Sequence, residues 1–461
     1  MDNSTKPFNL AIVGGGITGL TLAVNLLKHG VPFTVYESAA QFGEIGAGVG
    51  FGPNAVRTMA LISPQVKAAY DHCRTDKGVG KDSDSVWFHM RVGDRRKAET
   101  AAPDDGMEVN VPGTGAGRSE GKETFMYKGK KDHGIGDHLF VIHYPDLSKT
   151  GPVGGVHRAH YLDQLVRLLP PSVARFGKRL VNITGAGDGS GDAVLHFADG
   201  TTAQHTAVLA CDGVKSPTRK LLLGPRYSPV FSGKCAYRGL VPMEKAREII
   251  GDEKAMNSQI YFGYHGHLLT FPIEHGRTMN VVAFTSRESW TAPEWVVRVS
   301  KEQMNADFEE WGEDVKVIVS AMERQDVWAL FDHPPAPTYY GKTPRICLVG
   351  DAAHATTPHQ GAGAGMCIED CYILGELLGE ARSVADLDKV FKAYDDVRRP
   401  RTQGIVATSR EAGTLWDFEL EGIMDDLDLL EGNMRNRMGW IWNVDIEADM
   451  ERAREIFRQQ T

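Results

Sequence analysis

The chain has 461 residues, of which 42% are hydrophobic and 24% are charged, the composition of a globular protein of two or three domains. The formal net charge of −9 argues against nucleic acid or an anionic membrane surface as a partner, because both attract a surplus of Lys and Arg. Six cysteines are too few for a disulfide scaffold and their spacing fits no zinc pattern, so we expect no metal site and a reducing, cytoplasmic compartment.

The first 40 residues predict a strand, a helix and a second strand. Residues 8–13 form a short apolar run, residues 17–29 place apolar side chains at helical spacing, and residues 31–36 form the next apolar run. Residues 10–27 contain no charge, but the glycines and polar side chains among them argue against a membrane span. We therefore expect a buried βαβ unit, followed by a short helix over residues 54–62.

The loop between this first strand and helix has the pattern G-x-G-x-x-G, formed by Gly14, Gly16 and Gly19. In this context the first glycine permits a tight turn, the second lets a pyrophosphate approach the backbone, and the third lets the helix pack on the strand. Glu37 follows the second strand, where a carboxylate can accept hydrogen bonds from an adenosine ribose. The motif predicts a dinucleotide site, but by itself it does not distinguish NAD from FAD.

A second nucleotide-type loop is predicted in the C-terminal half. Residues 345–349 predict a short buried strand, Gly350 and Asp351 follow it, and after Pro358 a glycine-rich stretch that includes Gly363 opens a helix. An Asp at a strand end can hold a chain of hydroxyl groups, and a helix N-terminus can receive an electron-rich group. Two such loops suit an elongated cofactor that crosses the domain, so they favour FAD over NAD alone.

The remainder of the chain predicts a mainly antiparallel sheet and a helical C-terminal part. Strands are expected over 236–241, 259–262, 267–273 and 279–284, a hairpin over 193–197 and 202–210, and helices over 161–169, 301–322, 365–380 and 387–397. Pro400 is expected to begin a new helix, and residues 404–461 to be helical. Between residues 73 and 142 the periodicity is lost and turn residues dominate, which predicts a lid or a partly disordered insertion.

A third motif, Asp212-Gly213, follows the apolar residues 207–210, and Asp212 could either cap the next helix or touch a cofactor. In order and spacing the three motifs resemble those of the single-component FAD-dependent aromatic hydroxylases, and the chain most resembles their salicylate hydroxylase-like branch. Further matches lie at residues 43–48, 156–159, 236–240, 397–401 and 440–442. The resemblance covers nearly the whole chain, apart from much of 73–142.

The pattern and the resemblance together imply an α/β fold. A Rossmann-type FAD-binding domain is expected to be interleaved with a mainly antiparallel-sheet substrate domain and followed by C-terminal helices. We assign residues 1–72, 140–222 and 335–400 to the FAD-binding domain, residues 73–139 and 223–334 to the substrate domain with its lid-like insertion, and residues 401–461 to a C-terminal helical segment.

The resemblance also implies cofactor contacts for residues that match the family's motifs. Glu37 would hold the ribose of FAD, Asp351 the ribityl chain, and Ala364 would approach the flavin end. Asp212-Gly213 would touch both FAD and NAD(P)H. The full set expected to bind the cofactor is Gly14, Gly16, Gly19, Glu37, Gly50, Arg158, Asp212, Gly213, Gly350, Asp351, Gly363 and Ala364.

Three residues are candidates for contact with the reacting atoms. The backbone around Pro358 would border them, and Arg238 matches an active-site arginine of dearomatising relatives. Arg238 stands in an apolar strand and needs an anion, which is either the substrate or a buried Asp or Glu. The tyrosine partner in those relatives aligns with Phe271, which has no hydroxyl and disfavours dearomatisation. His267 is the third candidate, although a histidine on a strand is more often structural.

The resemblance implies a monooxygenase that consumes NADH or NADPH and O₂. It would hydroxylate a small phenolic or hydroxybenzoate-type substrate through a flavin C4a-hydroperoxide, with loss of CO₂ where the attacked carbon bears a carboxylate. The alternatives are epoxidation or dearomatisation of a secondary metabolite, a flavin-binding redox-responsive protein without turnover, and an NAD-only dehydrogenase, against which the Gly350-Asp351 loop argues. The resemblance leaves open whether the protein is a homodimer.

Overall fold

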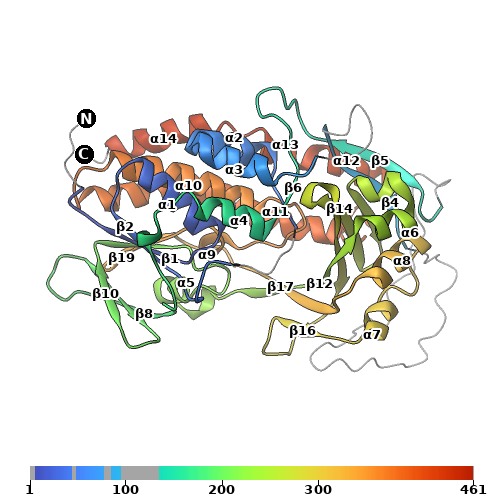
Figure 1. Cartoon of the computed structure of the whole chain (residues 1–461), viewed down its shortest axis with the longest axis horizontal. Coiled ribbons are helices and arrows are strands. Elements are labelled where there is room, and N and C mark those ends of the chain that lie inside the picture. The colour runs from blue at the N-terminus through green and yellow to red at the C-terminus, as the bar shows by residue number, and fades with distance from the viewer. Residues whose placement is uncertain (1–5, 44–47, 77–84, 95–133, 460–461) are drawn as a thin grey trace.

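The computed structural model describes residues 6–43, 48–76, 85–94 and 134–459 (Figure 1). Two large sheets occupy the two ends of the molecule, one with six strands and one with eight, and helices run above them (Figure 1). Within these ranges, no helix has both the length and the apolar character that crossing a membrane requires.

The six-stranded sheet is the predicted Rossmann-type layer. Its strand order is β18-β19-β11-β1-β2-β7, and every neighbouring pair is parallel except the edge pair β18 and β19. Strands β1 and β11 are wholly apolar and buried, which is typical of a parallel sheet covered on both faces. The strands are β1 (Leu10–Val13), β2 (Phe33–Tyr36), β7 (Ala174–Arg175), β11 (Ala207–Ala210), β18 (Tyr340–Lys342) and β19 (Arg345–Leu348).

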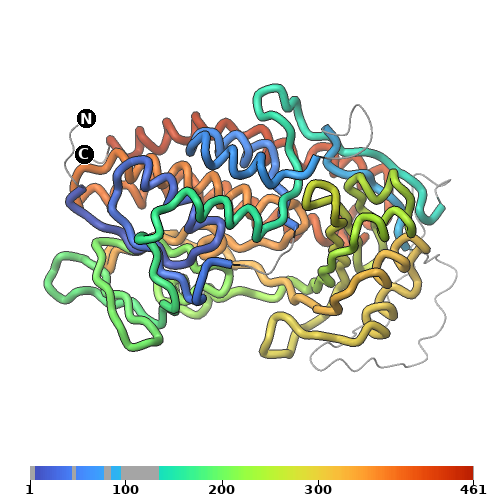
Figure 2. The backbone as a smooth tube through the Cα atoms, viewed as in Figure 1, coloured from blue at the N-terminus to red at the C-terminus, as the bar shows by residue number. Residues whose placement is uncertain are grey.

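The helices of this layer come from both ends of the chain. Helix α1 (Ile17–Lys28) packs on α10 (Gly363–Glu380), and Figure 2 shows blue N-terminal helices beside orange and red C-terminal ones. The amide of Asn25 donates to the carbonyl of Cys371 across this contact, at 3.0 Å. The other helices here are α2 (Pro53–Ile62), α3 (Pro64–Cys73), α4 (Arg158–Val166), α5 (Pro217–Leu223), α9 (Asp351–His354), α11 (Asp386–Trp416) and α14 (Ile446–Gln459).

The eight-stranded sheet is mainly antiparallel, as predicted. Its order is β16-β17-β12-β15-β14-β13-β4-β5, and only β13 and β4 run parallel among the strands described. Its strands are β4 (Val86–Val92), β5 (His138–His143), β12 (Val230–Pro242), β13 (Gln259–Gly263), β14 (Gly266–Ile273), β15 (Thr278–Ser286), β16 (Val296–Arg298) and β17 (Asp326–Asp332).

Each face of this sheet has its own apolar core. One core packs under α6 (Met243–Met256), α7 (Lys301–Ala306) and α8 (Glu313–Ala321). The other includes side chains from the end of α11, from α12 (Leu427–Arg437) and from α13 (Gly439–Trp442). The sheet is therefore covered on both sides, and the second face also borders the cavity described below.

Two smaller sheets complete the structure. Strands β8 (Leu180–Gly185), β9 (Ala193–Phe197) and β10 (Thr202–His205) form one, and β3 (Gly48–Gly50) and β6 (Gly155–His157) form the other. The N–H of Gly48 donates to Oδ1 of Asn280 at 3.0 Å, so β3 is tied to the eight-stranded sheet.

The prediction that Pro400 begins a helix is wrong, because Pro400 lies inside the continuous helix α11. A proline in a helix interior loses one backbone hydrogen bond and crowds the preceding turn. Tertiary contacts outweigh that cost here. Arg398 and Arg401, on either side of the proline, make ion pairs of 2.8 Å with Glu369 of α10.

Two other predictions need correction. Residues 202–210 are not one arm of a hairpin: β10 pairs antiparallel with β9, and β11 then joins the six-stranded sheet parallel to β1. Within 73–142, where no regular structure was predicted, β4 and β5 extend the eight-stranded sheet. Most of the expected lid, at residues 77–84 and 95–133, lies outside the described residues, so the lid stays a prediction.

Candidate active site

A cavity of about 1650 Å³ lies where the two sheets meet. The loops that follow β1, β2, β11 and β19 line one side of it, and a face of the eight-stranded sheet lines another. On that face Arg238, Val282, Leu269 and Ile260 form a row across four paired strands. Ligands of open α/β sheets bind at the carboxyl ends of the strands, so this is the expected place for a site.

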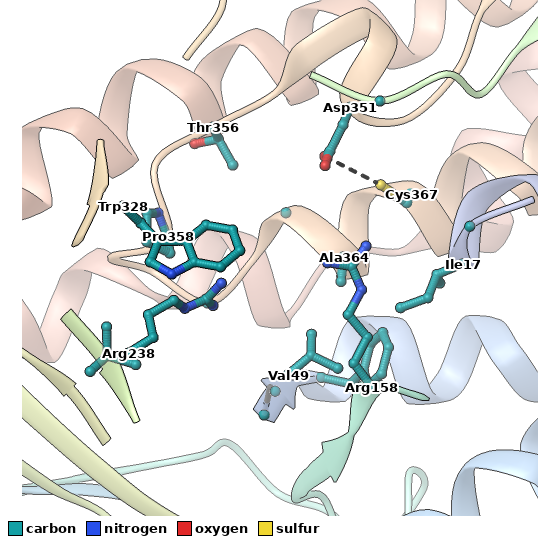
Figure 3. Close-up of a pocket in the computed structure, with 18 of the residues that line it drawn as sticks. Ile17, Val49, Arg158, Arg238, Trp328, Asp351, Thr356, Pro358, Ala364 and Cys367 are labelled. Carbon is teal, nitrogen blue, oxygen red and sulfur yellow. Dashed lines mark hydrogen bonds between the residues drawn. The ribbon is translucent and has the colours of Figure 1, made fainter. Parts of the chain in front are cut away.

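The charged side chains of the cavity approach from different elements. Figure 3 shows Arg238, from strand β12, and Arg158, from the start of helix α4, extending into the space from below, with Asp351 facing them from above. Pro358 and Ala364 border the same space (Figure 3). Three segments that are distant in the sequence therefore meet at one place.

The first glycine loop fits a pyrophosphate. Gly14 has φ = +104°, and a Cβ there would lie 2.3 Å from the carbonyl oxygen of Cys211. Gly16 is the N-cap of α1 and supplies no side-chain cap, so the first N–H groups of the helix lack a side-chain acceptor at the cavity wall. Gly19 does not line the cavity, because it packs against Gly14. A Cβ at Gly19 would lie 2.0 Å from the carbonyl oxygen of Gly14.

Glu37 lines the cavity at the end of β2, and the protein already holds its carboxylate. The N–H of Gly15 donates to Oε2 at 2.7 Å, and the N–H of Ala39 donates to Oε1 at 2.8 Å. Each carboxylate oxygen can accept more than one hydrogen bond. Glu37 is therefore oriented by the loop it follows and can still accept hydrogen bonds from a ribose.

Asp351 lines the cavity at the start of α9, with its carboxylate 3.9 Å from the thiol of Cys367 (Figure 3). Gly350 before it has φ = +64° and does not line the cavity. A Cβ at Gly350 would lie 2.6 Å from Oγ1 of Thr18, so this glycine lets the loop pack on α1. Packing between the loop and α1 thus accounts for the glycine at position 350. The position of Asp351 on the cavity wall, in contrast, suits contact with a polar ligand.

The N-terminus of α10 forms a second cradle. Gly363 and Ala364 open this helix and line the cavity, and Ala362 before them supplies no side-chain cap. The helix has 18 residues, so its first N–H groups and its dipole can receive an electron-rich group. The two uncapped helix N-termini and the two carboxylates fit an elongated dinucleotide such as FAD.

A buried ion network supports the loop of Gly350. Oδ2 of Asp370 accepts hydrogen bonds from the N–H of Gly350 at 3.1 Å and from His354 at 2.6 Å, and Oδ1 accepts one from Arg398 at 2.8 Å. Burial alone would raise the pKa of Asp370, but His354 and Arg398 outweigh it and hold the pKa at about 2. Asp370 is therefore ionised at neutral pH and anchors the loop.

Asp212 accepts a hydrogen bond from the first turn of α5, as the capping interpretation expects, while its contact with a cofactor stays a prediction. It lines the cavity, while its carboxylate accepts hydrogen bonds from the hydroxyl of Ser216 at 2.6 Å and from the N–H of Thr218 at 3.1 Å. Burial raises the pKa of Asp212. Gly213 follows with φ = +76° and also lines the cavity, so the turn places its backbone beside any ligand there.

Gly50 and Arg158 line the same side of the cavity, next to the paired strands β3 and β6. Phe271 of β14 packs against this pair: a Cβ at Gly48 would lie 2.7 Å from its ring, and one at Gly155 would lie 2.9 Å away. Phe271 thus reaches the cavity as an apolar wall and brings no hydroxyl to it.

Arg238 is the cation on the sheet face of the cavity. Within the described part of the chain no carboxylate forms an ion pair with it, and its guanidinium lies 5.4 Å from the ring centre of Trp328. Burial lowers the pKa of Arg238 to about 10, and the positive charge of Arg158 acts in the same direction. Two guanidinium groups close enough to repel each other favour an anionic ligand between them.

The structure does not bring His267 to the cavity, which counts against its expected contact with the reacting atoms. Its side chain is fully buried behind Phe284, with the ring centres 4.1 Å apart, and its Nδ1 lies 2.6 Å from Asp417. Pro358, in contrast, lines the cavity as expected.

Sequence reasoning missed several ring side chains of the cavity wall. Trp87, Trp328 and His359 line it, together with Trp442 from a stretch noted only as a family match. Trp87 and Trp328 stand on strands of the antiparallel sheet, where no local pattern separates a cavity-facing ring from a core ring. His359 follows Pro358 directly, and this adjacency is the signal that could have drawn attention to it.

Comparison with known proteins agrees with this geometry. The family described as "FAD binding domain" matches residues 164–409, and the family described as "NAD(P)-binding Rossmann-like domain" matches residues 12–48. The chain is 38% identical over 456 residues to 6-methylsalicylate 1-monooxygenase of Aspergillus terreus, covering 97% of this chain and 92% of the relative. It is 36% identical over 470 residues to salicylate hydroxylase of Pseudomonas putida, covering 98% and 95%.

Solved structures show the same relation. A salicylate hydroxylase in a substrate complex matches with a TM-score of 0.77 and 31% identity, over 98% of both chains. CtdE in complex with FAD and a substrate matches with a TM-score of 0.75 and 18% identity, which shows likeness of fold. The chain therefore belongs to the single-component FAD-dependent aromatic hydroxylases, in their salicylate hydroxylase-like branch, and is an FAD-dependent monooxygenase.

Proposed function

We propose that the protein hydroxylates a phenolic or hydroxybenzoate-type substrate at the expense of NADH or NADPH and O₂. The observation that carries this proposal is Arg238, a cation on the cavity wall that has no carboxylate partner in the described structure. A phenolate or a ring carboxylate would supply the missing anion. A guanidinium can hold such a group through two parallel hydrogen bonds and so set the angle of the ring.

The remaining residues divide between cofactor and substrate. Glu37 and the loop of Gly16 would hold the adenosine and pyrophosphate, and Asp351 would hold the ribityl chain. Bound FAD, reduced by NAD(P)H and loaded with O₂, would supply an electrophilic oxygen through a C4a-hydroperoxide. Arg238 would favour the ionised phenol, which is the electron-rich form, and the apolar rings of the sheet face would keep water away from it.

Phe271 favours hydroxylation over the dearomatising alternative. The resemblance implies a tyrosine at this position in dearomatising enzymes, and Phe271 lines the cavity with a ring that carries no hydroxyl. Where the attacked carbon bears a carboxylate, hydroxylation would release CO₂. The names of two relatives, 6-methylsalicylate 1-monooxygenase and salicylate hydroxylase, make ring carboxylates the first substrates to test.

The test is a substrate screen on the purified holoenzyme. Hydroxybenzoates, including salicylate and 6-methylsalicylate, are offered with NADH or NADPH, and nucleotide oxidation, O₂ uptake and products are followed by absorbance, oxygen electrode and mass spectrometry. We expect one class to accelerate NAD(P)H oxidation and to gain one oxygen atom. A substrate that loses its carboxylate in the same step would establish decarboxylative hydroxylation.

Three results would contradict the proposal. An epoxide or a dearomatised ring as the main product would favour the second chemistry, and binding of flavin without any substrate-stimulated turnover would favour a redox-responsive role. A purified protein without a flavin spectrum, and unable to bind added FAD, would contradict the cofactor assignment itself.

A further inference from the structure

Two histidines and a glutamate, none of which has a role in the assignments above, gather at the rim of the cavity. They are His157, His160 and Glu274, and one potential ligand atom of each lies within 4.8 Å of those of the other two. The side chain of His157 is 13% exposed and lines the cavity, whereas that of His160 is 51% exposed. The group therefore reaches from the cavity wall to solvent.

The start of α4 places the two histidines side by side. His157 ends β6 and is the N-cap residue of α4, and His160 lies in the first turn of that helix. Residues three positions apart are neighbours on a helix surface. The two ring centres are 4.2 Å apart, so the imidazoles form a close pair.

Glu274 comes from the other large sheet. It opens the short turn η4 (Glu274–Gly276) between β14 and β15, where Glu274 and His275 have φ of +54° and +56°, uncommon for residues other than glycine. Two hydrogen bonds hold this turn: the N–H of His275 donates to Oγ1 of Thr75 at 3.0 Å, and the hydroxyl of Thr278 donates to Oε2 of Glu274 at 2.6 Å. The carboxylate is therefore oriented through Oε2, while Oε1 lies near the histidines.

The spacing of the three side chains suits an ion between them better than direct hydrogen bonds. Oε1 of Glu274 lies 3.9 Å from Nε2 of His157 and 4.0 Å from Nε2 of His160, and both distances are too long for a hydrogen bond. Among the residues that the structure describes, no Lys or Arg forms an ion pair with Glu274. Ligand atoms of a tetrahedral zinc ion lie about 3.4 Å apart, because each bond is about 2.1 Å long. Modest rotation of the half-exposed His160 would bring the group to that spacing.

The protonation of the group also suits a metal ion, which needs neutral imidazoles. Burial lowers the pKa of His157, and His160 acts in the same direction, while Glu274 and Asp163 oppose them. His157 is therefore neutral at neutral pH. Two imidazoles with one carboxylate match Zn²⁺, whereas Mg²⁺ and Ca²⁺ prefer oxygen ligands throughout.

We propose that His157, His160 and Glu274 bind one Zn²⁺ ion, with water in the remaining position on the exposed side of His160. The ion clamps two parts of the fold together, since the histidines belong to β6 and α4 and the glutamate to the turn after β14, against which β6 lies (Figure 1). It also steadies the segment that carries Arg158, which lines the cavity. The prediction of no metal site followed from the cysteines, and none of them belongs to this group.

The test is a metal titration of the holoenzyme that does not measure turnover. Holoenzyme treated with a chelator and then freed of it is titrated with Zn²⁺ near neutral pH by calorimetry, and its melting temperature is followed in parallel. We expect one ion per chain at this site, a higher melting temperature, and no competition from excess Mg²⁺. His160→Ala and Glu274→Gln should each lower the affinity for Zn²⁺ by about 100-fold and remove the thermal shift, while FAD content and the far-UV circular dichroism stay unchanged.

Two further variants separate this site from non-specific binding. Thr278→Val removes the hydrogen bond that orients Glu274 and should weaken Zn²⁺ by about tenfold. His72→Ala removes an exposed histidine in the last turn of α3, far from the group in sequence, and should bind Zn²⁺ as the wild type does.

The proposal is overturned if the holoenzyme shows no saturable binding of Zn²⁺. It is also overturned if His160→Ala and Glu274→Gln bind Zn²⁺ as tightly as the wild type, because the protein would then hold an adventitious ion only, at another place. Since turnover is not measured, either result leaves the proposed hydroxylation untouched, and a protein that hydroxylates no phenol would leave the metal site intact.

Discussion

At the scale of the residue, Arg238 lies beside the ring of Trp328 and near a second cation, Arg158, and it forms no ion pair with a carboxylate of the described residues. We predict that Arg238→Lys keeps normal FAD content but lowers kcat/KM and oxidises more NAD(P)H per product, with hydrogen peroxide as the leak. Lysine keeps the charge and loses the planar fork. Arg238→Gln, which loses both, should be worse. Product yield per NAD(P)H, measured with a peroxide assay, checks the prediction.

Arg298→Gln is the matched control, because Arg298 is exposed at the end of β16 in the same sheet. It should leave coupling and kcat/KM unchanged. If Arg238→Gln folds, holds FAD and turns over with full coupling, Arg238 is structural and the site assignment is wrong.

Asp351 allows a test of the cofactor site that does not depend on the substrate. Asp351→Ala removes a charged acceptor from the expected ribityl position, so FAD binding should weaken by about 1.5–3 kcal/mol. FAD retention after gel filtration and the dissociation constant of added FAD give the answer. Asp71→Ala, which removes a carboxylate paired with Lys67 on the surface of α3, should leave both unchanged. Equal affinity in the two variants would place the ribityl chain elsewhere.

At the scale of the element, helices α10 and α11 are joined by buried charges. Arg398 makes ion pairs of 2.8 Å with Glu369 and with Asp370, and all three side chains are fully buried. We predict that Arg398→Met lowers the free energy of unfolding by about 3–5 kcal/mol, because each of the two buried carboxylates loses one of its cations and keeps only Arg401, for Glu369, or His354, for Asp370. Chemical denaturation followed by circular dichroism measures this. Arg452→Met, at an exposed position of α14, should have little effect.

The ion pair between Arg398 and Asp370 also predicts how the free energy of unfolding falls at low pH. The pKa of Asp370 is lowered to about 2 in the folded protein, so its contribution to the free energy of unfolding is complete above about pH 4 and is lost as the pH falls toward 2. In Arg398→Met the pKa of Asp370 should rise, and this loss should begin at higher pH. An unchanged pH midpoint of acid unfolding in the variant would contradict the role given to Arg398 in lowering the pKa of Asp370.

Helices α10 and α11 also show what local sequence patterns fail to predict. The helical spacing of residues 387–397 is correct, but the rule that proline begins a helix fails at Pro400, because ion pairs to another helix hold the turn together. In the same way, β4 and β5 lie in a stretch without periodicity, and they become strands by pairing with β13 and with each other.

At the scale of the whole molecule, the cavity lies between the two large sheets. Residues of both sheets line it, so FAD bound there would stabilise both parts of the fold. We predict that removal of FAD lowers the melting temperature and that free FAD at 100 times its dissociation constant restores about 2.7 kcal/mol. Tryptophan fluorescence reports on the cavity, since Trp87, Trp328 and Trp442 line it, and far-UV circular dichroism reports on the whole fold.

FMN is the control ligand, because it lacks the adenosine half. It should restore less stability than FAD at the same free concentration, because it binds more weakly. Glu37→Ala should narrow the difference between the two flavins. An apoprotein that melts at the temperature of the holoprotein would show that the cavity is not the FAD site.

The sequence by itself determined the parts of this protein whose signal is local. Gly14, Gly16, Glu37 and Asp351 stand at the ends of strands, and a strand, its turn and the next residue are neighbours along the chain, so their place in a Rossmann-type layer follows from spacing. The antiparallel character of the second sheet and the helical C-terminal part followed in the same way.

Only the tertiary structure decided which side chains share the cavity. The surroundings of Arg238, including its contact with Trp328 and its lack of an ion pair in the described structure, depend on elements that are distant in the sequence. The same is true of the burial of His267 away from the cavity. Burial and pairing are properties of those contacts. The alternation of a strand says which side chains share a face, but the packing of the elements above that face says which of them stays open to a ligand.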